Sequence, residues 1–259
     1  MGLFILSGAS LNCYLNFYKT SFINYKTKAM RILPVWIFIF LPVLLLGQNE
    51  LDLEMVDSTA SREDHIYIGI TYNVILNRPA GVTQNNLAYG IQLGYIRDIP
   101  INKMRNFGFG IGLGYAVNNY FTNLLAQETT SGITYEAIAD DVSFKRNKIE
   151  AHLLEMPLEI RWRTSTAKSY KFWRIYGGVK LGYIFANQSK FVGDGGKINF
   201  TNDDINRFQT DLYLSFGYNT WNFYASYGLR KVFKSNTITT AGEPIDIRIL
   251  KAGLIFYLL

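Results

Sequence analysis

Charged side chains stand at alternate positions within several otherwise apolar segments of this 259-residue chain. In segment 149–163, Glu155, Glu159 and Arg161 alternate with leucine, methionine and isoleucine. Acidic and basic groups that share one enclosed face can form ion pairs, relay protons or line a narrow ion path. The charges expected to share such a face are Glu155, Glu159, Arg161, Arg174, Lys180, Asp211, Arg230, Asp246 and Arg248.

We expect these charges to pair with one another and to fill the space that they share. The physical reason is that an unpaired buried charge costs several kcal/mol. A narrow conducting or proton-relay path is one alternative role for them, and carboxylate catalysis is another.

Other chemistry-bearing residues are few. His65 and His152 are the two histidines, whereas a zinc site needs more nitrogen or sulfur ligands. A dyad that uses His152 is conceivable, but no local motif marks a nucleophile or an oriented base. The single cysteine, Cys13, lies in the part of the chain expected to be removed. We therefore expect no catalytic residue, no metal, no cofactor and no enzymatic activity.

Two glycine-rich segments invite ligand hypotheses. The glycines of 107–115 lie inside a predicted strand with no helix after it, which argues against a phosphate-binding loop. Segment 193–196 together with 202–204 could bring oxygen ligands to calcium, although a polar loop is the expectation.

The run 107–115 also indicates which element positions the charges. Large apolar residues take every odd position and glycine every even one, which predicts a β-strand. A glycine face suits the crowded interior of a small barrel, where side chains from the opposite wall need room. The apolar face must then point outward, into lipid.

The same period of two predicts about eight strands. They are expected at 66–76, 87–97, 106–118, 149–163, 172–186, 207–218, 221–233 and 245–259. Segments 119–147 and 187–206 are expected to be long loops, 98–100 a short connection and 219–220 a tight turn.

An even strand number and alternating long and short connections predict an all-β fold, a transmembrane antiparallel up-and-down β-barrel. A soluble β-sandwich is the alternative fold. The predicted location is the outer membrane of a Gram-negative bacterium, with both termini in the periplasm and the long loops outside the cell.

Composition agrees with a barrel surrounded by aromatic girdles, because aromatic residues make up 15% of the chain and charged residues only 18%. The net charge of +6 comes mostly from residues 1–47, which hold four basic residues and no acidic one. The remainder has 22 basic residues against 20 acidic ones, so nothing points to nucleic-acid binding.

Four segments are expected along the chain. Residues 1–29 form an upstream extension that need not be translated. Residues 30–47 resemble a signal peptide, with Arg31 before an apolar run and Gly47 at the cleavage site. Residues 48–64 form an acidic periplasmic lead-in, and residues 65–259 form the barrel domain.

The segment Leu154–Arg161, Leu-Glu-Met-Pro-Leu-Glu-Ile-Arg, resembles a strand motif of the PorT-like outer-membrane β-barrel family. The continuation through 163–166 and 170–180 is also similar to that family, as is the junction at Gly47 and Gln48. Met156 stands where isoleucine or valine is commoner. The resemblance implies an accessory or assembly role in type IX protein secretion, and in gliding motility where that occurs.

Three functions therefore remain open at this point. The first is a non-enzymatic accessory barrel, whose partners are outer-membrane lipid and other secretion-machinery proteins. The second is a small porin or transport barrel. The third is a surface adhesion or structural barrel that uses loop 119–147. No small-molecule substrate is evident, and no nucleic acid is expected as a partner.

Overall fold

The computed structural model describes residues 64–139, 141–164, 173–193 and 196–258. The predicted extension, signal peptide and almost all of the lead-in lie outside these residues, and they stay predictions. The strands of the described part are β1 (His65–Leu76), β2 (Tyr89–Pro100), β3 (Phe107–Phe121), β4 (Leu124–Thr129), β5 (Gly132–Ala137), β6 (Phe144–Arg163), β7 (Trp173–Gly193), β8 (Gly196–Phe200), β9 (Phe208–Tyr218), β10 (Trp221–Gly228) and β11 (Arg248–Leu258). No helix among the described residues is long and apolar enough to cross a membrane.

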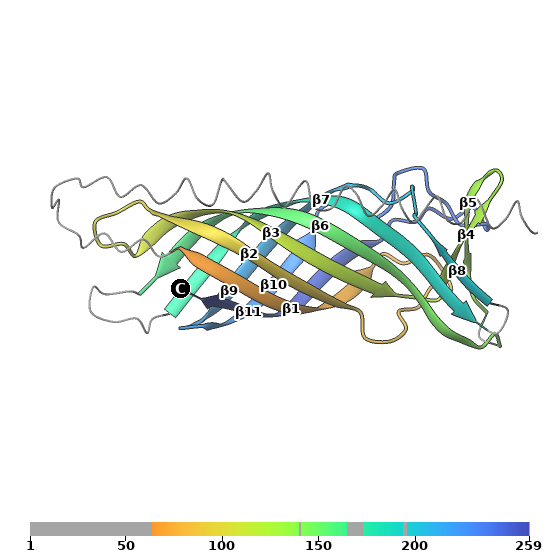
Figure 1. The fold of residues 1–259 in the computed structure, drawn as a ribbon, viewed down its shortest axis with the longest axis horizontal. Helices are drawn as coiled ribbons and strands as arrows, with labels where there is room; N and C mark the ends of the chain where they lie inside the picture. Colours follow the sequence, from red (N-terminus) through yellow and green to blue (C-terminus); the bar gives the residue numbers. More distant parts are fainter. Residues whose placement is uncertain (1–63, 140, 165–172, 194–195, 259) are drawn as a thin grey trace, which may run out of the picture. The chain divides into compact units, whose positions relative to one another are not determined.

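Eight of these strands close into an antiparallel barrel. The hydrogen-bonded order is β6-β3-β2-β1-β11-β10-β9-β7, and β6 pairs with β7 to complete the circle. Figure 1 shows the strands tilted around one axis, with β4, β5 and β8 at the end opposite to the C-terminus. The predicted eight-stranded up-and-down barrel is confirmed.

The first and last barrel strands, β1 and β11, are paired over eleven residue pairs. Their register runs from Ile66 opposite Leu258 to Leu76 opposite Arg248. This pairing leaves neither strand with an exposed edge, and a closed wall satisfies backbone groups that lipid could not.

The wall has the predicted two faces. Outward side chains such as Ile70, Leu113, Leu214 and Phe223 are apolar and exposed. The inward glycines make room for large side chains: a Cβ at Gly94 or Gly114 would overlap the ring of Tyr67, and one at Gly110 would crowd Arg161 and Glu159. The glycine face therefore has the role that the sequence indicated.

Several connections contain more structure than predicted. Segment 119–147 holds the end of β3, the hairpin β4–β5 and the start of β6, and segment 187–206 holds the end of β7 and all of β8. Residues 98–100 belong to β2, and they are not a short connection. The hairpin lacks an alternating pattern because it buries few apolar side chains, among them Leu124, Ala126 and Tyr135.

An apolar core closes the loop end of the bore. It joins inward residues of the wall to residues of the long connections, so that the connections fold over the opening. Phe233 is buried there and packs edge-on against Tyr135, with 5.3 Å between the ring centroids. The main members are Ile75, Val82, Tyr120, Leu124, Tyr135, Ile149, Leu153, Ile184, Ile205, Val232, Phe233, Ile245, Ile247 and Ile249.

Candidate functional site

The densest group of buried charges lies inside the barrel near the end with the short turns. Arg161 is fully buried, and its Nε lies 2.6 Å from Glu159 Oε1. Its Nη1 lies 3.2 Å from Asp98 Oδ1, and its guanidinium stacks over the ring of Tyr176 at 4.7 Å. The Tyr213 hydroxyl donates to Glu159 Oε2 at 2.5 Å. Each charge is thus held by opposite charges and hydrogen bonds, as a buried charge requires.

Asp98 and Arg163 belong to the same group although they were not among the predicted charges. Arg163 Nη2 lies 2.7 Å from Asp98 Oδ2, so one carboxylate bridges two guanidinium groups. Asp98 was missed because Pro100, two residues later, suggested a turn. The alternation of 149–163 placed Arg163 on the inner face, and that signal was sufficient to find it.

Two further ion pairs fill the middle of the bore. Lys180 Nζ lies 3.1 Å from Glu155 Oε2 and donates to Gln92 Oε1 at 2.5 Å. Lys251, which was not predicted, donates to Asp211 Oδ2 at 2.7 Å. Of the charges predicted to pair with one another, Glu159 pairs with Arg161 and Glu155 with Lys180. Asp211 pairs instead with Lys251, which was not among them.

Tyrosine rings fill the space between these ion pairs. The Lys180 ammonium lies 5.1 Å from the ring centroid of Tyr224 and 5.3 Å from that of Tyr213. Arg174 is also buried, 6.0 Å from the ring of Tyr257. Cation–π contacts of this kind are strongest where water is excluded. Two interior cavities beside Glu155, Asp211 and Lys251 have volumes of only about 10 and 20 Å³, too small for a channel.

Three predicted inner charges are placed differently. Arg230 follows the end of β10 and is exposed. Asp246 and Arg248 are half-buried, whereas Ile245 and Ile247 beside them are buried. The prediction assumed polar residues inside at every height, but the bore is apolar where the loops close it.

Asp246 pairs with Lys231 at 2.5 Å, and Arg248 donates to the backbone oxygens of Gly228 and Leu229. Asp246 and Arg248 therefore stabilise the connections at the loop end of the barrel.

The residues considered for calcium have structural partners. The Tyr135 hydroxyl lies 2.9 Å from Asn202 Oδ1 and 3.0 Å from Asp204 Oδ2, so it ties the hairpin to segment 202–204. Residues 194 and 195 lie outside the described part. No group of three or more histidine, cysteine or acidic residues that could hold a metal occurs among the described residues.

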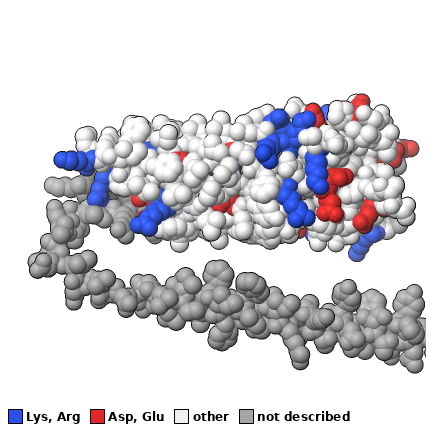
Figure 2. Space-filling model, turned by 90° about the horizontal axis from the view of Figure 1, so that it is seen from above, with Lys and Arg blue, Asp and Glu red and all other residues white. Residues whose placement is uncertain are grey.

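A polar cluster lies on the outside of the wall, where β6 and β7 extend toward the loops. Glu150 accepts from Lys148 at 2.6 Å and from Lys190 at 3.1 Å. His152 Nε2 lies 3.3 Å from Glu150 Oε1, and the Tyr115 hydroxyl lies 2.6 Å from His152 Nδ1. Figure 2 shows Lys and Arg at both ends of the barrel, with the larger group beside Asp and Glu at one of them, and few charged side chains between on the face in view.

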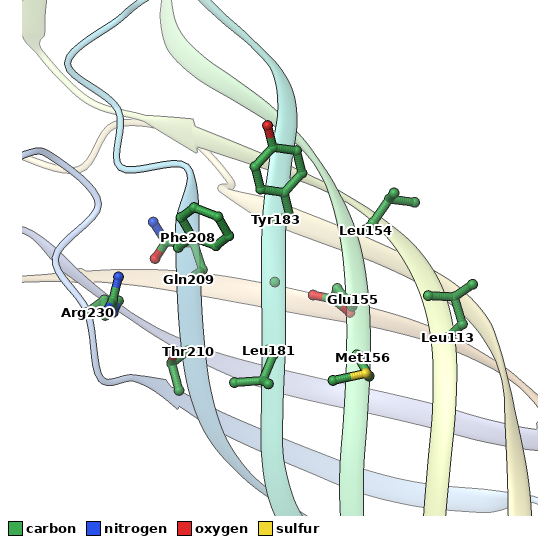
Figure 3. Close-up of a pocket in the computed structure, with 11 residues that line it drawn as sticks. Leu113, Leu154, Glu155, Met156, Leu181, Tyr183, Phe208, Gln209, Thr210 and Arg230 are labelled. Atoms are coloured by element: carbon green, nitrogen blue, oxygen red, sulfur yellow. The ribbon is translucent and has the colours of Figure 1, made fainter.

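Next to this cluster a cavity of about 400 Å³ spans parts of β3, β6, β7 and β9. Figure 3 shows the side chains of Leu113, Leu154, Met156, Leu181 and Tyr183 around it. Gly182, between the last two in the sequence, also lines it. The remaining lining residues are Glu155, Phe208, Gln209, Thr210 and Arg230.

A closed barrel with an apolar outside and a charged inside is the architecture of bacterial outer-membrane proteins. A family model described as outer membrane protein beta-barrel domain matches residues 48–234, more than half of the chain. The chain belongs to this family. It is therefore an outer-membrane β-barrel protein.

Other comparisons give distant similarities. A crystal structure of Ail, the attachment invasion locus protein of Yersinia pestis, is 14% identical with a TM-score of 0.32, over 74% of this chain and 97% of that chain. The structure of Ail in complex with the heparin analogue sucrose octasulfate gives the same identity and TM-score, over 75% and 99%. None of the curated proteins compared with the chain matches it significantly in sequence.

The apolar outside of this outer-membrane barrel has the height of a membrane. Along β9, the exposed rings of Phe208 and Tyr218 stand ten residues apart. At about 3.3 Å per residue and a tilt of about 40°, this spacing spans roughly 25 Å along the barrel axis. The rings of Tyr115, Phe185, Tyr183 and Phe208 form an aromatic collar on the loop side, and Glu150 with its lysines lies beyond it.

The hydrogen bonds around Glu150 predict a lowered pKa that can be measured. Hydrogen bonds from Lys148 and Lys190 lower the pKa of Glu150 from 4.5 to about 2, outweighing the opposing effect of burial. A folded-state pKa below the unfolded value adds stability above about pH 4.5, and this contribution is lost as the pH falls toward 2. Carboxyl ¹³C NMR of the barrel in micelles should give this value. K190M should raise it, and an unchanged pKa in that variant would contradict the assignment.

Proposed function

We propose that this protein is a PorT-like, non-enzymatic accessory or assembly component of type IX protein secretion, and of gliding motility where that occurs. The observation that carries the proposal is the filled bore. Ion pairs and tyrosines occupy its interior, and the apolar core covers its loop end. A barrel of this kind cannot conduct a folded passenger, so it would act through its surfaces. The motif at Leu154–Arg161 supplies the link to this secretion system.

Deletion of the gene tests this function. We expect the deletion strain to lose secretion of type IX cargo, measured by mass spectrometry of culture medium, while its outer membrane retains other barrels. A plasmid with the wild-type gene should restore secretion. Normal cargo secretion in the deletion strain would refute the proposal.

The porin alternative is less well supported. The described interior cavities of about 10 and 20 Å³ leave no room for a solute, and the loop core covers the opening. Discrete conductance steps from the folded protein in planar bilayers would favour transport over the accessory role.

A surface adhesion or structural barrel is the second candidate. The observation in its favour is the β4–β5 hairpin, which Tyr135 fixes to segment 202–204 and to the apolar core. A recognition surface of this kind is preorganised, which lowers the entropic cost of binding a partner. Exchanging residues 127–134 for a Gly-Ser linker should then abolish adhesion of the cells to their target surface and leave secretion of type IX cargo intact.

We further propose that the termini lie in the periplasm and that the β4–β5 hairpin lies outside the cell. Ser131 is exposed at the tip of this hairpin, and Lys103 is exposed in the connection at the other end. Residues 48–259 contain no cysteine, so S131C and K103C introduce single thiols. A membrane-impermeant maleimide should label S131C in intact cells, and K103C only after permeabilisation. The reverse pattern would invert the orientation.

A further inference from the structure

The polar cluster outside the barrel carries more positive charge than its own carboxylate balances. Lys148 and Lys190 are directly opposite each other on β6 and β7. Like charges at such positions repel, and here one carboxylate, Glu150, lies between them. Arg146, two residues before Lys148 on the same strand, is exposed and adds a third cation. The cluster can therefore accept a further anion.

Unused hydrogen-bond donors point to the same conclusion. An ammonium group has three N–H donors. Lys148 uses two of them, toward Asn119 Oδ1 at 2.6 Å and Glu150 Oε2 at 2.6 Å. Lys190 uses one, toward Glu150 Oε1 at 3.1 Å. Lys148 also lies over the ring of Phe121, 5.7 Å from its centroid. Among the described residues, three donors of the two lysines have no hydrogen-bond acceptor, and those of Lys190 in particular could serve an oxygen-rich anion such as phosphate.

The aromatic collar and the cavity lie next to this cluster on the same strands. Tyr115 is stacked beside His152, with ring centroids 6.1 Å apart, and Phe185 lies 6.2 Å from His152. Leu113 and Leu154, which line the cavity, each follow two residues further toward the membrane centre. Two residues of a strand span about 7 Å. The polar cluster, the aromatic collar and the apolar cavity therefore follow one another along β3 and β6.

We propose that this face binds one phosphorylated glycolipid of the outer leaflet. Its phosphate would lie on Lys148 and Lys190, its sugar against Tyr115 and Phe185, and an acyl chain in the cavity beside Leu154. Free phosphate has no apolar part that could occupy the cavity. An acidic protein could not reach below the aromatic collar into the membrane. The choice of leaflet rests on the orientation proposed above, while the site itself is independent of the secretion role.

Native mass spectrometry of the folded barrel in a neutral detergent tests the site. The probes are a bisphosphorylated lipid A, the same lipid without phosphates, and inorganic phosphate as a competitor. We expect one bisphosphorylated lipid on the wild type and at least tenfold weaker binding by K148M/K190M, because charge-assisted hydrogen bonds to both lysines are lost. K103M, the same substitution at the opposite end, should bind like the wild type.

Two further variants test the contributions of charge and of the cavity to lipid binding separately from any effect on folding. K148R/K190R retains both positive charges and should bind within a few-fold of the wild type. M156W fills the cavity and should weaken lipid binding with both lysines present. Equal binding of the dephosphorylated lipid, full displacement by millimolar phosphate, or wild-type affinity of K148M/K190M in a barrel that still migrates as folded would each overturn the site.

Discussion

Replacing Arg161 by methionine is expected to lower the free energy of unfolding by about 3–5 kcal/mol. The substitution leaves the buried carboxylate of Glu159 without its ion-pair partner, and it leaves Asp98 with Arg163 but without Arg161. Burying an uncompensated charge dominates this cost, whereas the loss of packing is small because methionine fills most of the same space. Urea titration of the barrel in micelles, followed by its heat-modifiable migration on gels, measures the change.

The double variant E159Q/R161M is the informative control. It removes the opposite charge together with Arg161, so its loss of stability should be clearly smaller than that of R161M alone. K145M, at an exposed lysine near the loop end, should leave the unfolding midpoint unchanged. If R161M is as stable as the wild type, the charged bore is not held together by this ion pair.

Replacing Phe233 by alanine should open the loop end and leave the wall intact. Phe233 is 1% exposed, and loss of a buried phenyl ring costs about 3–5 kcal/mol. The connections should lose this stability, because they are held by the apolar core and make few hydrogen bonds to the barrel wall. We therefore expect them to unfold locally. Limited proteolysis should then cleave segments 122–143 and 229–247 of F233A within minutes, while the barrel remains folded on gels.

I238A provides the matched comparison, because Ile238 lies in the same connection and is 55% exposed. It should be cleaved no faster than the wild type. Global unfolding of F233A would show that the apolar core stabilises the whole barrel and does more than close its end.

Alternation predicted the wall well because each barrel strand obeys one rule, with one face toward lipid and the other toward the bore. The rule placed Glu155, Glu159 and Arg161 correctly. It failed toward the loop end, where the inward face becomes apolar and the outward face becomes polar. Along β6 the inward residues change from charged to apolar beyond Glu155, and Ile149 and Leu153 join the loop core.

The same exchange explains the wrong placement of Asp246 and Arg248. Inward positions before Lys251 are the isoleucines of the loop core, so the polar residues between them point away from it. A single sequence offers no signal for the height at which this change occurs. The hairpin β4–β5 was missed for a related reason, since its position depends on contacts such as that between Tyr135 and Asn202.

The proposed secretion role depends on the resemblance of a strand motif, because the fold by itself does not specify a role. The polar cluster of Lys148, Glu150 and Lys190 could not be predicted from the sequence either, because it joins residues of two strands that are some 40 positions apart. Alternation alone, however, sets Lys148 and Glu150 on the face opposite to Ile149, and that signal could have found half of it.

The pairing of β1 with β11 has a consequence for biogenesis. The barrel can close only after its last strand has been synthesised, because the two partners of this seam lie at opposite ends of the domain. Contacts between residues so far apart in the sequence form late and slowly. Until β11 arrives, β1 and β10 present unpaired edges that are prone to aggregate. A partner that shields both edges until the seam is made would therefore protect this barrel from aggregation.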